Sequence, residues 1–229
     1  MSEFQQLSHA EQLERLDELA MLAAIEFGIS VERHSLLQYE DNAVYRLRGR
    51  DGAEYVLRVS AEAGYSAEQQ ASELEWLLSL WRAGLPVPEP LATLLQVHTE
   101  KVAARSCALF RWISGQLPGK DMSPRQIAEL GAVTARLHQQ SRNFTPSRAF
   151  NRPNLDWQAA FGSGAGGSSA VPPLERELLL RLKRRFQSML PAFESAATGL
   201  VHGDLHRDNI LLRDGAISIT DFDDCGWGY

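Results

Sequence analysis

Three short extended runs near the N-terminus limit most strongly what this chain can fold into. They cover roughly residues 33–39, 43–48 and 54–60, with the turn sequences EDN at 40–42 and RDG at 50–52 between them. Both separators carry the residue types that form hairpin turns. Because a hairpin joins strands that run in opposite directions, this part of the chain is predicted to form an antiparallel sheet.

Helices and two further strands surround these runs. Ser8 and Glu11 have the spacing of a capping box and precede apolar residues at helical spacing, which predicts a first helix. A second helix is predicted over about 66–83, and two more strands near 94–98 and 103–110. The order helix, three strands, helix, two strands predicts an α+β fold with a five-stranded antiparallel sheet and its helices on one side.

The second half of the chain is predicted to be mostly helical. Helices are expected over 123–140 and 174–190, and the connection between them is rich in Pro, Gly, Ser and Asn. This connection is long for a compact domain, so we expect a mobile loop there or a short helix around Trp157. A GxGxxG pattern at 162–167 follows no predicted strand and leads into no helix, so it is interpreted as a loop and not as a dinucleotide-binding motif.

The overall composition argues against several classes of partner. The net charge of −6 leaves no basic footprint, so neither nucleic acid nor an anionic membrane is expected as the main partner. Cys107 and Cys225 lack CxxC spacing, which predicts reduced thiols and neither a disulfide framework nor a zinc site. No segment resembles a signal peptide or a membrane span, so a cytoplasmic protein is predicted. The oligomeric state is left open.

A cluster of acidic and imidazole side chains surrounds a predicted hairpin near the C-terminus. The segment reads LVHGDLHRDNILLRDGAISITDFDD and ends at Asp224. The hairpin strands are expected over 210–213 and 216–220, joined at Asp214-Gly215. Buried carboxylates are costly unless they are paired or bind a cation, so such a cluster on rigid elements indicates a functional site.

The motifs HGDLHRDN and ITDFDD resemble the catalytic segment of the aminoglycoside phosphotransferase and choline kinase family, the small-molecule relatives of protein kinases. The resemblance covers most of the chain from about residue 38. It implies a bilobal, protein-kinase-like fold, with a nucleotide-binding lobe over 1–111 and a hinge plus a mostly helical catalytic lobe over 112–229. Because members of the family continue with further helices beyond the position of Tyr229, the second lobe is predicted to be truncated.

The resemblance implies roles for the acidic residues of this segment. Asp204 stands where an Asp of this catalytic segment is expected to position the acceptor hydroxyl and accept its proton, while Asn209 and Asp221 stand at the metal-binding positions. Asp223 is a candidate for a second ion. These residue types suit the chemistry, since phosphoryl transfer needs a carboxylate near the acceptor and hard oxygen ligands for Mg²⁺.

Further residues are implied to contact the nucleotide. Arg58 stands where the family usually carries a Lys that contacts phosphates, and Glu73 is expected to pair with it, with Glu75 as the fallback partner. Asn42 is expected at the tip of a hairpin that covers the phosphates, which here contains no glycine. The segment FRWISG falls at the hinge. The residues expected to meet the base there through their backbone groups are Phe110, Arg111, Trp112 and Ile113.

These positions together predict a Mg²⁺-dependent phosphotransferase that uses ATP or GTP to phosphorylate a hydroxyl of a small molecule, as aminoglycoside, choline and homoserine kinases do. One alternative is a nucleotide-binding pseudokinase or inactive fragment, favoured by the early end of the chain. Another is a stress-response-type Ser/Thr protein kinase. A third is a metal-dependent hydrolase on His202, Asp204 and His206, which would need further ligands along the chain. The acceptor stays open.

Overall fold

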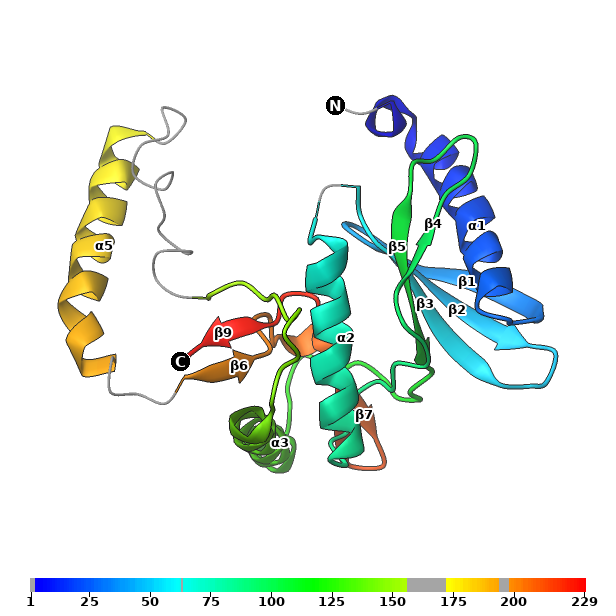
Figure 1. Ribbon diagram of the computed structural model, residues 1–229. Helices are drawn as coiled ribbons and strands as arrows, with labels where there is room; N and C mark the ends of the chain where they lie inside the picture. Colours follow the sequence, from blue (N-terminus) through cyan, green and yellow to red (C-terminus); the bar gives the residue numbers. More distant parts are fainter. Residues whose placement is uncertain (1–2, 63, 156–171, 194–197) are drawn as a thin grey trace.

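A five-stranded antiparallel sheet forms the first half of the molecule, as the sequence predicted (Figure 1). Its strands are β1 (Val31–Tyr39), β2 (Ala43–Gly49), β3 (Glu54–Val59), β4 (Leu95–Val97) and β5 (Arg105–Arg111). They lie in the order β1-β2-β3-β5-β4, and every neighbouring pair is antiparallel. The two N-terminal hairpins therefore form where the turn sequences placed them.

The computed structural model describes residues 3–62, 64–155, 172–193 and 198–229. The expected loop or short helix around Trp157 and the GxGxxG pattern at 162–167 lie outside these described residues.

Capping residues fix where the predicted helices begin. The helices are α1 (His9–Glu26), α2 (Ala67–Arg82), α3 (Pro124–Asn143) and α5 (Pro173–Phe193), with the short turns η1 (Phe4–Gln6) and η2 (Arg207–Asn209). The capping box of Ser8 and Glu11 forms as predicted, and Ser66 and Ser123 cap α2 and α3 in the same way. No helix in the described part of the chain is long and apolar enough to cross a membrane.

Helices α1 and α2 pack on opposite faces of the sheet, so the expectation that the helices lie on one side was wrong (Figure 1). Tyr45 and Leu57 belong to the core beneath α1. Val56 and Phe110 belong to the core that contains α2. Successive side chains of a strand point to opposite faces of the sheet. Because Val56 and Leu57 on β3 are neighbours and both apolar, both faces of the sheet must be packed against other elements.

Two small strand pairs complete the C-terminal half. The predicted hairpin forms from β7 (Ile210–Arg213) and β8 (Ala216–Ile219), with φ of 50° at Asp214 and 81° at Gly215. A second pair, β6 (Gly199–Val201) with β9 (Gly226–Gly228), was not predicted. Strands of three residues are too short to show a period, and glycine is a poor strand former, so only the contact between distant segments reveals this pair.

The core that contains α2 extends into the C-terminal half. It includes Trp76 of α2, Leu137 of α3, Leu200 of β6 and Phe222, all of them buried. The rings of Trp76 and Phe222 meet edge to face with their centroids 5.6 Å apart, a favoured aromatic geometry. Helix α2 is therefore the element through which the sheet and the C-terminal half share one hydrophobic core.

Replacing Leu137 by Ala should destabilise the protein strongly. Its buried side chain lies on α3 in this shared core, and a cavity left by Leu→Ala costs about 2–5 kcal/mol of unfolding free energy. Urea unfolding followed by circular dichroism measures the loss. Leu117→Ala is the matched control, because Leu117 is exposed and its loss should stay within about 0.5 kcal/mol. Equal effects of the two substitutions would contradict this packing.

Candidate functional site

A cleft of about 580 Å³ lies between the sheet, α2 and the C-terminal hairpin. This volume lies within the range of small-molecule sites, roughly 300–1,000 Å³. All the residues that the sequence analysis singled out as site residues line it: Asn42, Arg58, Glu73, Phe110, Arg111, Trp112, Ile113, Asp204, Asn209, Asp221 and Asp223. Residues far apart in the chain thus converge on one cavity.

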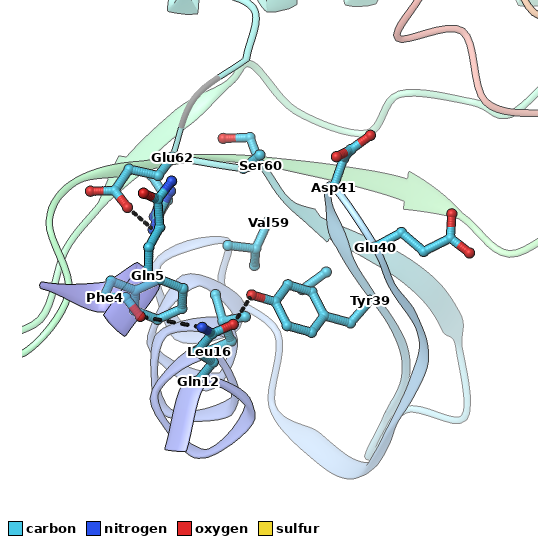
Figure 2. Close-up of a pocket in the computed structure, with 13 residues that line it drawn as sticks. Phe4, Gln5, Gln12, Leu16, Tyr39, Glu40, Asp41, Val59, Ser60 and Glu62 are labelled. Atoms are coloured by element: carbon cyan, nitrogen blue, oxygen red, sulfur yellow. Dashed lines mark hydrogen bonds and ion pairs between the residues drawn. The ribbon is translucent and has the colours of Figure 1, made fainter. Parts of the chain in front are cut away.

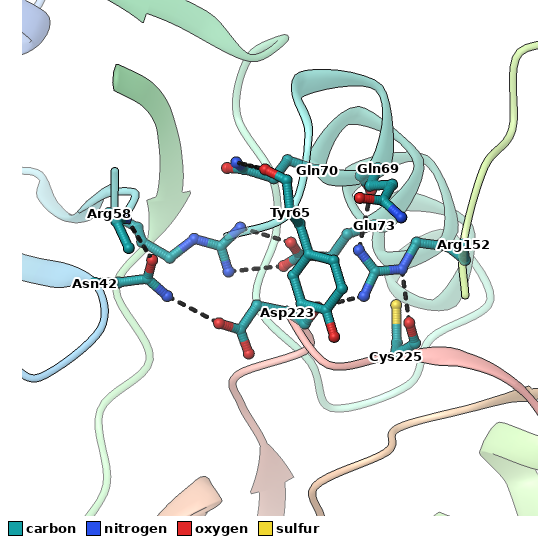
Figure 3. A network of polar contacts seen from close by, with 10 residues as sticks. Asn42, Arg58, Tyr65, Gln69, Gln70, Glu73, Arg152, Asp223 and Cys225 are labelled. Atoms are coloured by element: carbon teal, nitrogen blue, oxygen red, sulfur yellow. Dashed lines mark hydrogen bonds and ion pairs between the residues drawn. The ribbon is translucent and has the colours of Figure 1, made fainter. Parts of the chain in front are cut away.

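Arg58 and Glu73 form a buried ion pair on one wall of this cleft (Figure 3). The guanidinium donates two parallel hydrogen bonds, from Nη1 to Oε1 at 2.8 Å and from Nη2 to Oε2 at 2.6 Å. Only 6% of Arg58 and 1% of Glu73 is exposed. Burial lowers the pKa of Arg58, but the carboxylates of Glu73, Asp223 and Asp221 together outweigh burial and raise this pKa overall. The cation therefore stays charged and fixed in direction.

The fallback partner of Arg58 has a different contact. Glu75 accepts hydrogen bonds from the backbone N–H and the hydroxyl of Ser147, both at 2.7 Å. Helix α2 therefore presents Glu73 to the sheet, while Glu75 fixes the chain that follows α3.

Asp204 and Asn209 form one unit on the opposite side of the cleft. The amide nitrogen of Asn209 donates to the Asp204 backbone carbonyl at 2.9 Å and lies 3.4 Å from the Asp204 Oδ2. His206 Nε2 lies 3.1 Å from the same carboxylate oxygen. The Asn209 backbone carbonyl accepts from the Thr220 N–H at 2.9 Å, which ties this unit to the residue before Asp221.

Asp221 and Asp223 lie in a strained acidic loop that follows β8. Asp221 has φ of 61°, a left-handed conformation that is uncommon outside glycine and frequent at functional sites. Burial and the nearby Asp223 carboxylate raise the pKa of Asp221 to about 7, against the opposing effect of Arg58. Asn42 Nδ2 donates to Asp223 Oδ2 at 2.8 Å, and Asn42 Oδ1 accepts from the Ala61 N–H (Figure 3).

The donor set of this loop fits a hard divalent cation. Asp221 and Asp223 offer carboxylate oxygens and Asn209 offers an amide oxygen, which are the ligand types that Mg²⁺ and Ca²⁺ prefer. Among the described residues, no three His, Cys, Asp or Glu side chains are arranged to hold a metal ion by themselves. Mg²⁺ commonly binds through one or two carboxylates together with substrate phosphates, so the donors present suit a metal that binds together with a nucleotide.

His202 braces the loop that carries Asp204. Its Nε2 lies 2.9 Å from the Thr220 carbonyl, and its Nδ1 accepts from the Asp204 N–H at 3.3 Å. Burial lowers the pKa of His202, although the Thr220 carbonyl opposes this shift, so the neutral ring is favoured. Both ring nitrogens are engaged with the backbone, which counts against the metal-hydrolase alternative.

Backbone contacts hold the hinge segment at the edge of the cleft. The Arg111 N–H donates to the Glu89 carbonyl at 3.0 Å, and the Trp112 N–H donates to the Glu54 carbonyl at 3.1 Å. The guanidinium of Arg46 lies over the Trp112 ring at 4.2 Å from its centroid. Trp112 is thus held against the sheet both by its backbone and by its ring.

Two residues that shape the site were not among those predicted. Gly203 has φ of 89°, and a Cβ there would lie 2.2 Å from the Asp224 carbonyl oxygen, so the acidic loop can approach only a glycine. The Tyr65 hydroxyl donates to Asp224 Oδ1 at 2.8 Å. The glycine is visible in HGDLHRDN, whereas no local pattern marks Tyr65.

A second cavity, of about 190 Å³, lies on the α1 side of the sheet (Figure 2). Tyr39, Gln12 and Phe4 line it, and Arg105 lies beside the Phe4 ring with its Cζ 4.9 Å from the centroid. None of the described residues around it is a predicted site residue. The cleft is therefore the candidate site, and this cavity is not.

Replacing Glu73 by Ala should destabilise the fold by about 3–5 kcal/mol, because it leaves the buried Arg58 guanidinium without its counter-ion. Glu75→Ala on the same helix is the matched control and should cost about 1 kcal/mol, the net worth of its hydrogen bonds to Ser147. Chemical unfolding at neutral pH measures both. A Glu73 variant as stable as the Glu75 variant would show that the ion pair contributes no more than a surface contact.

His202 should make stability fall in mild acid. A histidine whose pKa is lowered in the folded state favours folding above its unfolded pKa of 6.5, and this contribution is lost as the pH falls through the folded pKa. The loss amounts to at most about 1.4 kcal/mol per pH unit. Asp221, whose pKa is raised to about 7, has the opposite effect over the same range. The change in urea midpoint on going from pH 7.5 to 5.5 should therefore be more favourable in His202→Gln than in wild type, because only the His202 contribution is removed. His98→Gln, at an exposed position, should retain the wild-type slope, and a His202 variant with that same slope would refute the assignment.

Comparison with known proteins places this geometry in a family. The model of the phosphotransferase enzyme family matches residues 36–229. The chain is similar to amicoumacin kinase of Bacillus subtilis (strain 168), with 26% identity over 229 residues that cover 90% of this chain and 62% of the relative. It is similar to homoserine kinase of Gluconacetobacter diazotrophicus, with 26% identity over 209 residues, 89% of this chain and 63% of the relative. The chain thus spans about three fifths of the length of these relatives.

A solved structure shares the fold. It is an amicoumacin kinase in complex with AMP-PNP, Ca²⁺ and Ami, which superposes with a TM-score of 0.73 at 21% identity. The match covers 96% of this chain and 68% of that one. At this level of identity the likeness concerns the fold alone, and it agrees with the protein-kinase-like architecture that the motifs implied.

Proposed function

Because this chain belongs to the phosphotransferase enzyme family, we propose that it binds a nucleotide and Mg²⁺ in the cleft and transfers the γ-phosphoryl group to a hydroxyl of a small molecule. The observation that carries this proposal is the convergence of Arg58, Asp204, Asn209 and Asp221 on one cavity of about 580 Å³. ATP and GTP are both candidate co-substrates. The similarity to amicoumacin kinase and homoserine kinase makes amicoumacin and homoserine the first acceptors to be tested.

The phosphates would lie between the two walls of the cleft. Arg58, held by Glu73, supplies a fixed positive charge, and each of its terminal nitrogens retains a second N–H beyond the one bonded to Glu73. Asn209, Asp221 and Asp223 would hold the metal ion. When bound, Mg²⁺ neutralises charge on the phosphates and orients them. The apolar side chains of the lining, including Val44, Val56 and Leu211, suit the flat faces of a nucleotide base.

The acceptor hydroxyl would lie against Asp204. This carboxylate is half exposed at the cleft, so a substrate can reach it, while Asn209 and His206 fix its direction. Asp204 would orient the hydroxyl oxygen toward the γ-phosphorus and receive its proton as the new P–O bond forms, while the bond from the γ-phosphorus to the β–γ bridging oxygen breaks and the nucleoside diphosphate leaves. Alignment of this kind supplies much of the catalysis in phosphoryl transfer.

A nucleotide-binding protein without turnover is the second candidate. The bidentate contact with Glu73 uses one N–H of each terminal nitrogen of Arg58, and this is the position where the family usually carries a Lys. Nucleotide-dependent stabilisation without phosphorylation of any acceptor would favour this candidate.

Replacing Asp204 by Asn should slow phosphoryl transfer strongly and leave nucleotide binding intact. Loss of a positioned base lowers turnover by about 10²–10⁴-fold, whereas the metal donors and Arg58 are unchanged. ADP release with homoserine, choline, aminoglycosides and amicoumacin as acceptors measures transfer, and the rise in melting temperature with Mg²⁺ and nucleotide measures binding. Asp214→Asn is the matched control, because Asp214 is exposed in the β7–β8 turn. Full turnover by Asp204→Asn, or no nucleotide-dependent shift in wild type, would overturn the proposed function.

A further inference from the structure

Arg152 lies directly behind the acidic loop, in a segment that the sequence analysis treated as connection (Figure 3). This segment is fixed by backbone hydrogen bonds to β9. The Leu155 N–H donates to the Trp227 carbonyl at 2.6 Å, and the Trp227 N–H donates to the Pro153 carbonyl at 2.8 Å. The chain around Arg152 is therefore held in place independently of its side chain.

The guanidinium of Arg152 joins two elements that build the cleft. Its Nε donates to the Cys225 carbonyl at 2.6 Å, and its Nη2 donates to the Asp223 carbonyl. Both carbonyls belong to the loop that carries the candidate metal ligands. Its Nη1 donates to the Gln69 carbonyl at 3.1 Å, in the first turn of α2, the helix that presents Glu73. The Arg152 side chain thus links the acidic loop to the first turn of α2 by hydrogen bonds.

Arg152 is buried, and burying its positive charge costs free energy unless hydrogen bonds compensate for the lost water. Only 5% of the residue is exposed, and a buried cation needs full hydrogen bonding to be tolerated. Its acceptors are carbonyl oxygens, together with the face of the Tyr65 ring, whose centroid lies 4.5 Å from Cζ. An apolar side chain would fill the same space but leave three carbonyls without this donor.

Tyr65 adds a second tie to the same loop. Its hydroxyl donates to Asp224 Oδ1 at 2.8 Å while its ring covers the guanidinium. Burial and this hydrogen bond raise the pKa of Tyr65 to about 12, so the hydroxyl remains a donor at neutral pH. The loop is thus held by its backbone through Arg152 and by a side chain through Tyr65.

We propose that Arg152 is a positioning residue that holds the acidic loop in the conformation in which Asp221 and Asp223 can share a metal ion. The inference rests on the proposed function, because it assigns the loop to metal binding. Arg152 is not among the described residues that line the cleft, so it acts through the loop backbone and not on the nucleotide or the acceptor. Groups that orient metal ligands in this way commonly change metal affinity by about 10–100-fold.

The chain offers a matched control for a test. Arg105 is also a buried arginine, 3% exposed, beside an aromatic ring, that of Phe4, but it lies beside the cavity under α1 and not in the cleft. Arg152→Met and Arg105→Met therefore remove equally buried cations, and only the first removes contacts to the acidic loop. Thermal unfolding by circular dichroism establishes the temperature at which both variants are folded.

The measurement is made at a temperature at which both methionine variants are folded. Electron paramagnetic resonance of the free ion gives the Mn²⁺ affinity in the presence of a non-hydrolysable ATP analogue. Arg152→Met should weaken Mn²⁺ binding by about 10–100-fold, and Arg105→Met should leave it unchanged. Arg152→Lys should lie between, because one ammonium cannot reach all three carbonyls as the planar guanidinium does. Added guanidinium ion should restore part of the Mn²⁺ affinity lost in Arg152→Ala and should leave the affinity of Arg105→Ala unchanged.

Three results would overturn the inference. One is Mn²⁺ affinity in Arg152→Met that equals wild type, and another is an equal loss in both methionine variants, which would indicate general destabilisation. The third result applies if Arg152→Met does not fold. In that case, wild-type Mn²⁺ affinity in the folded variants Arg152→Lys and Tyr65→Phe would refute the positioning role of Arg152. Failure of the wild-type protein itself to bind Mn²⁺ with the nucleotide analogue would instead refute the proposed function, and with it this inference.

Discussion

The buried ion pair of Arg58 and Glu73 is the interaction on which the rest of the site depends. It joins β3 to α2 on the face of the sheet opposite α1, and neither charge could remain there alone. Because α2 also sends Trp76 into the core that it shares with Leu137 and Phe222, the orientation set by this pair is transmitted to the C-terminal half. The distance between the sheet and the acidic loop is therefore fixed by packing and charge together.

Opposite charges face each other across the resulting cleft. Arg58, Asp221 and Asp223 all line this cleft. Burial and the nearby Asp223 carboxylate raise the pKa of Asp221 to about 7, against the effect of Arg58. A divalent cation bound together with phosphate would balance the charges of both groups, since the cation would compensate the carboxylates and the phosphate would pair with the Arg58 guanidinium. Asn42 and Arg152 hold the acidic loop from two further sides, which leaves little freedom for its carboxylates.

Local signals explain what could be predicted. The capping box at Ser8 and the Asp214-Gly215 turn depend only on neighbouring residues, and both form as expected. Asp204 and Asn209 lie five residues apart in the motif that carries the family resemblance, and their groups meet in the structure. Their roles in catalysis remain predictions. The pairing of β6 with β9, the opposite placement of α1 and α2, and the position of Arg152 depend on contacts between distant segments, and no local pattern indicates them.

The sequence by itself therefore determined the order of the helices and hairpins, the family resemblance and the set of candidate site residues. Tertiary structure showed that the expected Glu73, and not the fallback Glu75, meets Arg58, because helix α2 can turn only one of the two toward the sheet. It also decided that Gly203 must be glycine and that Arg152 stands behind the acidic loop, since both follow from how closely separate segments approach. Turn chemistry, helix caps and hydrophobic periodicity depend on residues a few positions apart, so the sequence shows them directly. The distance between backbone segments far apart in the chain is set only when the whole core packs.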